Sequence, residues 1–294
     1  MFSGFVNIIG NPNVGKSTLM NALVGEKLSI ITAKAQTTRH RIIGIVNGDN
    51  FQIVFSDTPG ILQPHYKLHE NMMSSVRAAI GDADIILYVT DVVEKIDKNR
   101  EYIERLQTLQ TPIILVINKV DLTTQDELEM LVARWKELLP AAYIFPAAAA
   151  GRFNTNNILK QVVALLPEGP AYYDKEVLTD KNLRFFASEI IREKILLRYY
   201  KEIPYSAEVT VEQFHEADDC YHIEATIHVV RASQKGIIIG RQGASLKQVG
   251  IQARKEMETF FEKKVHLKLL VKVTPNWREN PQQLKRFGYT VSDV

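Results

Sequence analysis

GNPNVGKS, residues 10–17, is the stretch that decides the fold of the first part of the chain. It directly follows the apolar segment FVNII (5–9) and leads into the amphipathic segment TLMNALVG (18–25). A strand, a glycine loop and a helix in this order make the pattern G-x-x-x-x-G-K-S a P-loop, whose backbone N–H groups face phosphate oxygens. We therefore expect Lys16 to place a charge at the outer phosphates and Ser17 to offer an oxygen to Mg²⁺.

The composition indicates a soluble globular protein with room for two domains, because 294 residues contain 46% hydrophobic and 24% charged residues. Its longest apolar runs are strand-sized, far below the roughly 20 residues of a membrane-spanning helix. The N-terminal segment lacks the succession of a secretion signal. Cys220 is the only cysteine, so we expect a packing role for it and a reducing, cytoplasmic location.

Basic residues are concentrated near the C-terminus. Between Arg231 and Arg286 there are thirteen basic and four acidic residues, a balance of +9 in a chain whose net charge is only +2. This asymmetry predicts a polyanionic partner for the C-terminal part. The alternative is a lysine-rich surface that serves only solubility.

A second motif, DTPG (57–60), ends a predicted hairpin that begins after the polar loop KAQTTRHR (34–41). A carboxylate at the end of a strand beside a P-loop is placed to hold the magnesium shell, which assigns that role to Asp57. The loop supplies a second hydroxyl ligand, Thr38 or alternatively Thr37, which we expect to be ordered only when a γ-phosphate is present. The backbone at the end of DTPG is expected to meet that phosphate.

Two apolar runs, ADIILYVTD (83–91) and PIILVI (112–117), are typical of parallel strands that are covered on both faces. The second ends in NKVD (118–121). A carboxylate at Asp121 accepts hydrogen bonds from both N–H donors on the edge of guanine, whereas adenine would leave it unpaired. Asn118 is expected to brace the base and its loop. The motif therefore predicts guanine specificity.

These motifs, in this order over about the first 165 residues, resemble the translation-factor class of small GTPases. Two departures stand out: Ile61 follows DTPG where many GTPases have a water-orienting glutamine, and FPAAAAG (145–151) has Ala148 where the family has serine, with the backbone N–H of Ala149 expected at the guanine carbonyl. The predicted nucleotide-binding residues are Gly10, Asn11, Pro12, Asn13, Val14, Gly15, Lys16, Ser17, Thr18, Asp57, Thr58, Pro59, Gly60, Ile61, Asn118, Lys119, Val120, Asp121, Ala148 and Ala149; Lys16, Thr38, Asp57 and Gly60 are expected to act in hydrolysis, and Ser17, Thr38 and Asp57 to bind the metal.

The second half of the chain follows a connector, PEGPAYYDKEVLTDKN (167–182), which is punctuated by proline and glycine. It predicts a GTPase domain over 1–170, a linker over 171–182 and a second domain with a tail over 183–294. That domain begins with an amphipathic helix and two alternating strands. IIIGRQGAS (237–245) then places a GxxG turn between two helices ahead of a final strand.

This order resembles a KH domain of the bacterial topology, in which the GxxG turn clamps about four single-stranded nucleotides beside an apolar groove. The alternative is a glycine turn in a core helix pair. The predicted RNA-binding residues are Lys235, Ile237, Ile238, Ile239, Gly240, Arg241, Gln242, Gly243, Lys247, Ile251 and Arg254. The tail aromatics Trp277, Phe287 and Tyr289 are expected to pack onto the domain rather than to stack on bases.

Essentially the whole chain resembles the Era GTPases, through GNPNVGKST, KAQTTRHRI, DTPG, NKVD, REKI with EIPYS, and IIGRQGASLK. The resemblance implies an α/β P-loop GTPase domain with a mixed, mostly parallel sheet and a smaller α+β KH domain. It also implies Mg²⁺-dependent hydrolysis of GTP to GDP, binding to the 3′ end of small-subunit ribosomal RNA, and action in maturation of that subunit. A cytoplasmic monomer is expected, and the resemblance allows a peripheral membrane-associated fraction.

Two alternatives remain open at this point. One is a nucleotide-gated RNA-binding module with negligible turnover, which Ile61 favours. The other is a GTPase whose second domain docks a protein or an anionic membrane surface.

Overall fold

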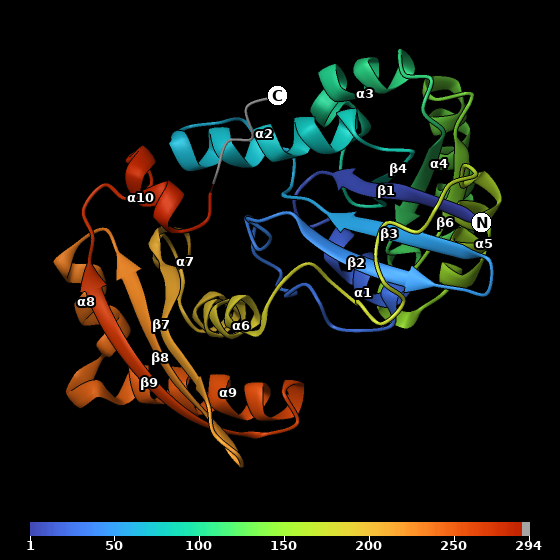
Figure 1. The fold of residues 1–294 in the computed structure, drawn as a ribbon. Helices are drawn as coiled ribbons and strands as arrows, with labels where there is room; N and C mark the ends of the chain where they lie inside the picture. Colours follow the sequence, from blue (N-terminus) through green and yellow to red (C-terminus); the bar gives the residue numbers. More distant parts are fainter. Residues whose placement is uncertain (290–294) are drawn as a thin grey trace. The chain divides into compact units, whose positions relative to one another are not determined.

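The computed structural model describes residues 1–289, without the side chains of residues 97 and 99. The described chain forms two compact units (Figure 1). One contains Met1–Pro64 and Asn71–Asp180, and the other contains His65–Glu70 and residues 181–289. The end of the predicted second domain, 290–294, lies outside the described residues.

A six-stranded sheet in the order β2-β3-β1-β4-β5-β6 forms the centre of the first unit. Only β2 runs antiparallel to its neighbour, so the predicted mixed, mostly parallel sheet is confirmed. Every residue of β4 and β5 is buried, because helices cover both faces. The strands are β1 Phe2–Gly10, β2 Ile42–Asn47, β3 Phe51–Asp57, β4 Ile85–Asp91, β5 Ile113–Asn118 and β6 Tyr143–Pro146.

The helices around this sheet follow its parallel strands, as right-handed crossovers require. Helix α1 packs on β1, β2 and β3 and on α5, and Figure 1 shows α1 and α2 on different sides of the sheet. Because β1, β3, β4 and β5 run parallel, they end at a common edge of the sheet, where the loops that follow β1, β3 and β5 meet. The helices are α1 Lys16–Val24, α2 Lys67–Gly81, α3 Arg100–Gln107, α4 Gln125–Leu138 and α5 Thr155–Leu165.

The connector after α5 is bonded to the first unit over much of its length. Its backbone meets β2, where Ile45 N donates to Leu178 O (2.8 Å), and the hydroxyl of Thr179 donates to Ile43 O (2.6 Å). Upstream, Gln52 of β3 donates to Tyr173 O (2.8 Å). The antiparallel strand β2, which follows the polar loop of residues 34–41, is thus also the strand to which the connector is attached.

The second unit has a three-stranded sheet in the order β7-β8-β9, antiparallel between β7 and β8 and parallel between β8 and β9. Its hydrophobic core joins one sheet face to α6, α8 and α9. Helix, two strands, two helices around GxxG and a last strand confirm the predicted KH topology. The elements are α6 Leu183–Arg198, α7 Ile203–Ser206, β7 Glu208–Glu216, β8 Cys220–Val229, α8 Ala232–Ile239, α9 Ala244–Phe260, β9 Lys264–Val273 and α10 Pro281–Arg286.

The tail aromatics pack onto this unit, as predicted. Trp277 is fully buried and its indole N–H donates to Ser206 O (3.0 Å). Phe287 lies against His228, and the hydroxyl of Tyr289 donates to Glu208 (2.6 Å). These contacts leave the three rings no free face for a base.

Cys220 is buried on β8, as its predicted packing role requires. Among the helices of the described residues, none has both the length and the apolar character needed to cross a membrane.

Candidate functional site

The P-loop lies between β1 and α1, at the edge where the parallel strands end. Gly10 and Gly15 have φ of 150° and 95°, which disfavour any residue with a side chain. A Cβ atom at Gly10 would overlap the carbonyl of Val89, and one at Gly15 would overlap the side chain of Asn118. Both positions therefore need glycine for conformation and for space.

The three predicted metal ligands come together although they lie on three different segments. The Ser17 hydroxyl donates to Asp57 Oδ2 (2.6 Å) and lies 2.8 Å from the Thr38 hydroxyl, which itself lies 3.3 Å from that same carboxylate oxygen. The other carboxylate oxygen, Asp57 Oδ1, is buried without a hydrogen-bond partner. Two hydroxyls and a carboxylate with an unsatisfied oxygen fit a hard cation such as Mg²⁺.

The structure also separates Thr38 from Thr37. The Thr37 hydroxyl donates to Lys34 O (2.7 Å) and lies 2.6 Å from the hydroxyl of Thr32, so it closes a turn within its own loop. Thr38 is buried and faces Ser17. Of the two alternatives that the sequence left open, Thr38 has the geometry of the ligand.

Lys16 is buried at the start of α1 and donates to Asn11 O (2.8 Å). Burial lowers the pKa of its ammonium group to about 8, although Asp57 and Glu94 partly oppose the shift. A cation held with so little solvent is stabilised by an incoming anion. This is the electrostatic setting expected at the outer phosphates of a nucleotide.

The segment after β3 packs directly against the P-loop. A Cβ atom at Gly60 would come within 2.8 Å of the Pro12 backbone, so this glycine allows the two loops to touch. Ile61 is 3% exposed and its N–H donates to Gly10 O (3.0 Å). Its buried side chain has no polar group with which to orient water.

Asn118 fastens three loops together at the other end of the site. Its Nδ2 donates to Val14 O (2.8 Å), and its Oδ1 accepts from the backbone N–H of Ala149 (2.9 Å). That N–H, expected at the guanine carbonyl, is therefore bonded to Asn118 in this structure. Asp121, which is predicted to accept hydrogen bonds from guanine, is exposed and therefore accessible to a ligand.

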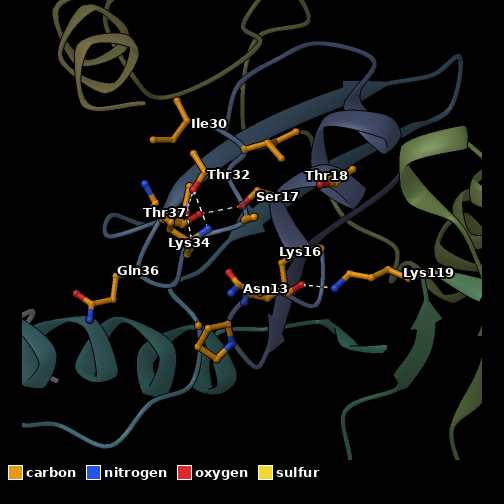
Figure 2. Close-up of a pocket in the computed structure, with 16 residues that line it drawn as sticks. Asn13, Lys16, Ser17, Thr18, Ile30, Thr32, Lys34, Gln36, Thr37 and Lys119 are labelled. Carbon is orange, nitrogen blue, oxygen red and sulfur yellow. Dashed lines mark hydrogen bonds between the residues drawn. The ribbon is translucent and has the colours of Figure 1, made fainter. Parts of the chain in front are cut away.

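Lys119 lies in the left-handed region with φ of 61°, and its side chain turns back over the P-loop. Its ammonium group donates to Asn13 O (2.6 Å, Figure 2). It also donates to Asp91 Oδ2 (2.6 Å). The side chain of this predicted nucleotide-binding residue is thereby held in place at the edge of the cavity.

A cavity of about 360 Å³ lies between the P-loop and the loop of residues 30–38 (Figure 2). It includes Lys16, Ser17, Thr38, Gly60 and Lys119 among the predicted residues. It also includes residues that the motifs did not identify, namely Ile30, Ile31, Thr32, Ala33, Lys34 and Gln36.

The predicted RNA-binding turn has two glycines with different requirements. Gly240 has φ of 72°, and a Cβ atom there would come within 2.6 Å of the Ser245 side chain. Gly243 has φ of 77°, but nothing lies within 4 Å of its Cβ position. Arg241 and Gln242 between them are exposed, so the turn presents open backbone and a positive charge.

A groove of about 390 Å³ runs from this turn between α9 and β9. Three residues that the sequence predicts to bind RNA, Lys247, Ile251 and Arg254, line it. Ile238 does not, because it is fully buried in the hydrophobic core of this unit, so its prediction as an RNA-binding residue was wrong. Ile237 is exposed on α8, and Ile239 is half-buried there.

Comparison with known proteins identifies the family. A family model described as "50S ribosome-binding GTPase" matches residues 5–119, and a KH domain model matches 202–278. Proteins named GTPase Era from Caldicellulosiruptor saccharolyticus and from Geotalea daltonii are each 45% identical to the chain, covering 99% and 98% of it and 99% and 97% of their own lengths. The chain belongs to the Era family of GTPases.

Solved structures of Era have the same fold. A point variant of Aquifex aeolicus Era bound to GDP·AlF₄⁻ is 37% identical, with a TM-score of 0.95 over 99% of this chain and 100% of the other. Era in complex with MgGDPNP and nucleotides 1506–1542 of 16S ribosomal RNA is also 37% identical, with a TM-score of 0.94 over 99% of each chain.

Several residues of this Era GTPase escaped the sequence reasoning. The groove is completed by Leu246, Gly250, Leu267 and Leu269. The alternating pattern of β9 was the available signal for the last two, because a strand at a sheet edge can lend its apolar face to a groove. The loop of residues 30–36 carries no periodic signal, and only its nearness to Thr38 in the chain pointed to it.

Proposed function

We propose that the chain is a Mg²⁺-dependent GTPase that binds the 3′ end of small-subunit ribosomal RNA and acts in maturation of the small ribosomal subunit. The observation that carries the proposal is the convergence of Ser17, Thr38 and Asp57 beside a P-loop, in a chain that also has an open GxxG turn beside an apolar groove. The likeness to Era bound to MgGDPNP and to 16S ribosomal RNA nucleotides supports it over 99% of the chain.

We propose that residues 1–170 act as the GTPase domain and residues 183–294 as the RNA-binding domain, with 171–182 as the linker. In the first, Lys16 binds the outer phosphates, the backbone at Gly60 meets the γ-phosphate, and Asp121 accepts from guanine. Ser17, Thr38 and Asp57 hold Mg²⁺, which when bound neutralises phosphate charge and polarises the bond to be cleaved. In the second domain the GxxG turn holds the RNA backbone, and Lys247 and Arg254 contact phosphates.

Because Ile61 has no group for orienting water, we propose that the attacking water is positioned by the backbone of the loop around Thr38 once that loop has closed. Chemistry then depends on the γ-phosphate ordering the loop. The alternative of a module with negligible turnover makes a different prediction, since it would release no phosphate. Phosphate release with and without RNA separates the two.

The path from nucleotide to RNA is proposed to run through β2. This strand begins after the loop that carries Thr38, and it bonds to the connector through Ile43 and Ile45. Closure of the loop is therefore proposed to shift β2, and with it the connector that is bonded to β2. RNA affinity then depends on which nucleotide is bound.

The proposal is tested by titrating fluorescent oligonucleotides from the 3′ end of small-subunit ribosomal RNA, with scrambled controls, into the GDPNP and GDP forms. We expect a sequence preference that strengthens with GDPNP, and a salt slope of about −0.7 per phosphate contacted. Lys16→Ala should abolish the nucleotide effect. Equal, purely salt-driven binding of every oligonucleotide would refute the RNA assignment and favour a protein or membrane partner.

We further propose that the protein works as a monomer in the cytoplasm, where the proposed ribosomal partner resides. Light scattering at micromolar concentration tests the monomer. Flotation with anionic vesicles tests for a peripheral membrane-bound fraction, which would appear as protein in the vesicle layer.

A further inference from the structure

An open groove of about 720 Å³ between α6 and α9 has no role in the proposed function. The two helices pack against each other in the second unit (Figure 1). Leu197, Arg198 and Tyr200 line the groove from the end of α6 and just beyond it, and Gln252 and Lys255 line it from α9. These α9 positions lie on a different face of that helix from the positions that line the groove beside β9. We call this second groove the α6–α9 groove.

Arg198 joins the α6–α9 groove to the GxxG turn. Its Nε donates to the hydroxyl of Ser245 (2.9 Å), in the first turn of α9, and a Cβ atom at Gly240 would come within 2.6 Å of that same side chain. The neighbouring Tyr199 hydroxyl lies 2.9 Å from Ser245 Oγ and donates to Ile238 O (2.7 Å). The end of α6 is therefore bonded to both sides of the turn, and the α6–α9 groove begins beside the backbone that is proposed to hold RNA.

The α6–α9 groove has positive charge that the protein itself does not neutralise. Lys194, which also lines the groove, is buried and paired with the carboxylates of Glu193 and Glu256. Arg198 and Lys255 are exposed, and among the side chains that the structure describes neither forms an ion pair with a carboxylate. The groove thus presents two cations to solvent, which favours a polyanionic ligand.

Apolar side chains lie beside these cations. Tyr200 is 72% exposed and Leu197 is 51% exposed. An exposed aromatic ring beside cations is the combination with which proteins bind single-stranded nucleic acid, because bases stack on the ring and phosphates contact the cations. The position of the groove favours RNA over a protein, since an RNA chain that is held at the GxxG turn has to continue past it.

We propose that the α6–α9 groove binds the nucleotides that adjoin those held at the GxxG turn, with a base stacked on Tyr200 and phosphates at Arg198 and Lys255. The proposal rests on the proposed function, because it requires RNA at the turn. The groove beside β9 accommodates the four or so nucleotides of a KH clamp, and the α6–α9 groove lengthens the RNA segment that the domain binds.

The experiment compares oligonucleotides of different length on the full chain with GDPNP and Mg²⁺. Windows of four nucleotides from the 3′ end of small-subunit ribosomal RNA first identify the core that binds most tightly. That core is then extended by four nucleotides on its 5′ side or on its 3′ side, and each affinity is measured at several salt concentrations. One extension should raise the affinity by about tenfold, the effect of one stacked base, and steepen the salt slope by about 1.4, the effect of two phosphates.

Variants of the groove residues assign this gain. Lys255→Gln and Arg198→Gln should each lower the salt slope of the extended oligonucleotide by about 0.7 and leave the binding of the four-nucleotide core unchanged. Tyr200→Leu should lower the affinity of the extended oligonucleotide by about tenfold, whereas Tyr200→Phe should keep it because the ring remains. Lys272→Gln is the matched control, because Lys272 is exposed on β9 and lines neither groove. It should behave as wild type.

The core oligonucleotide separates a contact in the groove from support of the turn. Arg198→Gln also removes the hydrogen bond to Ser245, so Lys255→Gln, which removes no hydrogen bond of the turn, decides the outcome. If neither extension raised the affinity of wild type, or if the gain persisted in both Lys255→Gln and Tyr200→Leu, the role of the α6–α9 groove would be overturned while RNA binding at the turn stood. Failure of the wild-type protein to bind any of the oligonucleotides would instead overturn the proposed function.

Discussion

Asn118→Ala is expected to loosen the nucleotide site even before any nucleotide is bound. The side chain is 2% exposed and makes two hydrogen bonds to backbone atoms of other loops, the carbonyl of Val14 and the N–H of Ala149. Truncation leaves one buried acceptor and one buried donor unpaired. Each costs about 1–3 kcal/mol, so the free energy of unfolding should fall by about 2–6 kcal/mol.

The effect on binding follows from the same loss. Without Asn118 the P-loop and the loop after β6 are no longer fastened to each other, and nucleotide binding must order them. Since 1.4 kcal/mol corresponds to tenfold in affinity, GDP affinity should fall by about ten- to a hundredfold. An exposed asparagine, Asn156 on α5, provides the control, because Asn156→Ala should change neither quantity.

The two tryptophans make the assay specific, since Trp135 is buried in the first unit and Trp277 in the second. In a Trp277→Phe background, Trp135 fluorescence during urea denaturation reports the unfolding of the first unit alone. Fluorescent GDP gives the affinity. If Asn118→Ala kept the wild-type urea midpoint of the nucleotide-free protein, the bracing role would be refuted, even if GDP affinity fell through a lost contact with the base.

Three further predictions concern other parts of the chain. The pKa of Lys16 is about 8 in the folded protein and about 10.5 when unperturbed. The nucleotide-free protein should therefore gain stability between pH 8 and 10.5, because only the unfolded chain holds the proton in that range. GDP affinity should fall by about tenfold between pH 7.5 and 9 as the ammonium group loses its proton, which titration calorimetry would show. Gly243→Asp should abolish RNA binding with a loss of stability of only about 1 kcal/mol, since its Cβ position is open, whereas Gly240→Ala should lower the melting temperature more. Thr179→Val removes the hydrogen bond to Ile43 O and should narrow the difference in RNA affinity between the GDPNP and GDP forms without changing nucleotide affinity.

The nucleotide site was largely predictable because each of its motifs comes at the end of a parallel strand or directly after it. Asp57 and Asn118 are the last residues of β3 and β5, and Ser17 lies on α1, directly after the loop that follows β1. The ends of such parallel strands meet at one edge of the sheet. Knowing the strands was therefore sufficient to place the three residues together. Thr38 was harder, because it lies in an aperiodic loop, and the choice against Thr37 depends on a turn that Thr37 closes with Lys34.

In the second unit, nearness in sequence to the GxxG turn was not sufficient to predict which residues line the groove. Ile237, Ile238 and Ile239 adjoin the GxxG turn, but consecutive helical positions point about 100° apart, so they cannot share one wall. Ile238 points into the core. The groove is instead completed by Leu267 and Leu269, two residues apart on β9, where the strand period places them on one face.

The nucleotide site also departs from the rule that buried polar groups are satisfied, and this departure is evidence about function. Asp57 Oδ1 has no partner, and burial raises the pKa of Asp57 while it lowers that of Lys16. Each charge is thus held where the fold alone makes it costly. A cation at the carboxylate and phosphates at the ammonium would relieve both costs together, which couples metal and nucleotide binding to the stability of the same loops. Such local costs are expected where selection has favoured binding over the stability of the empty protein.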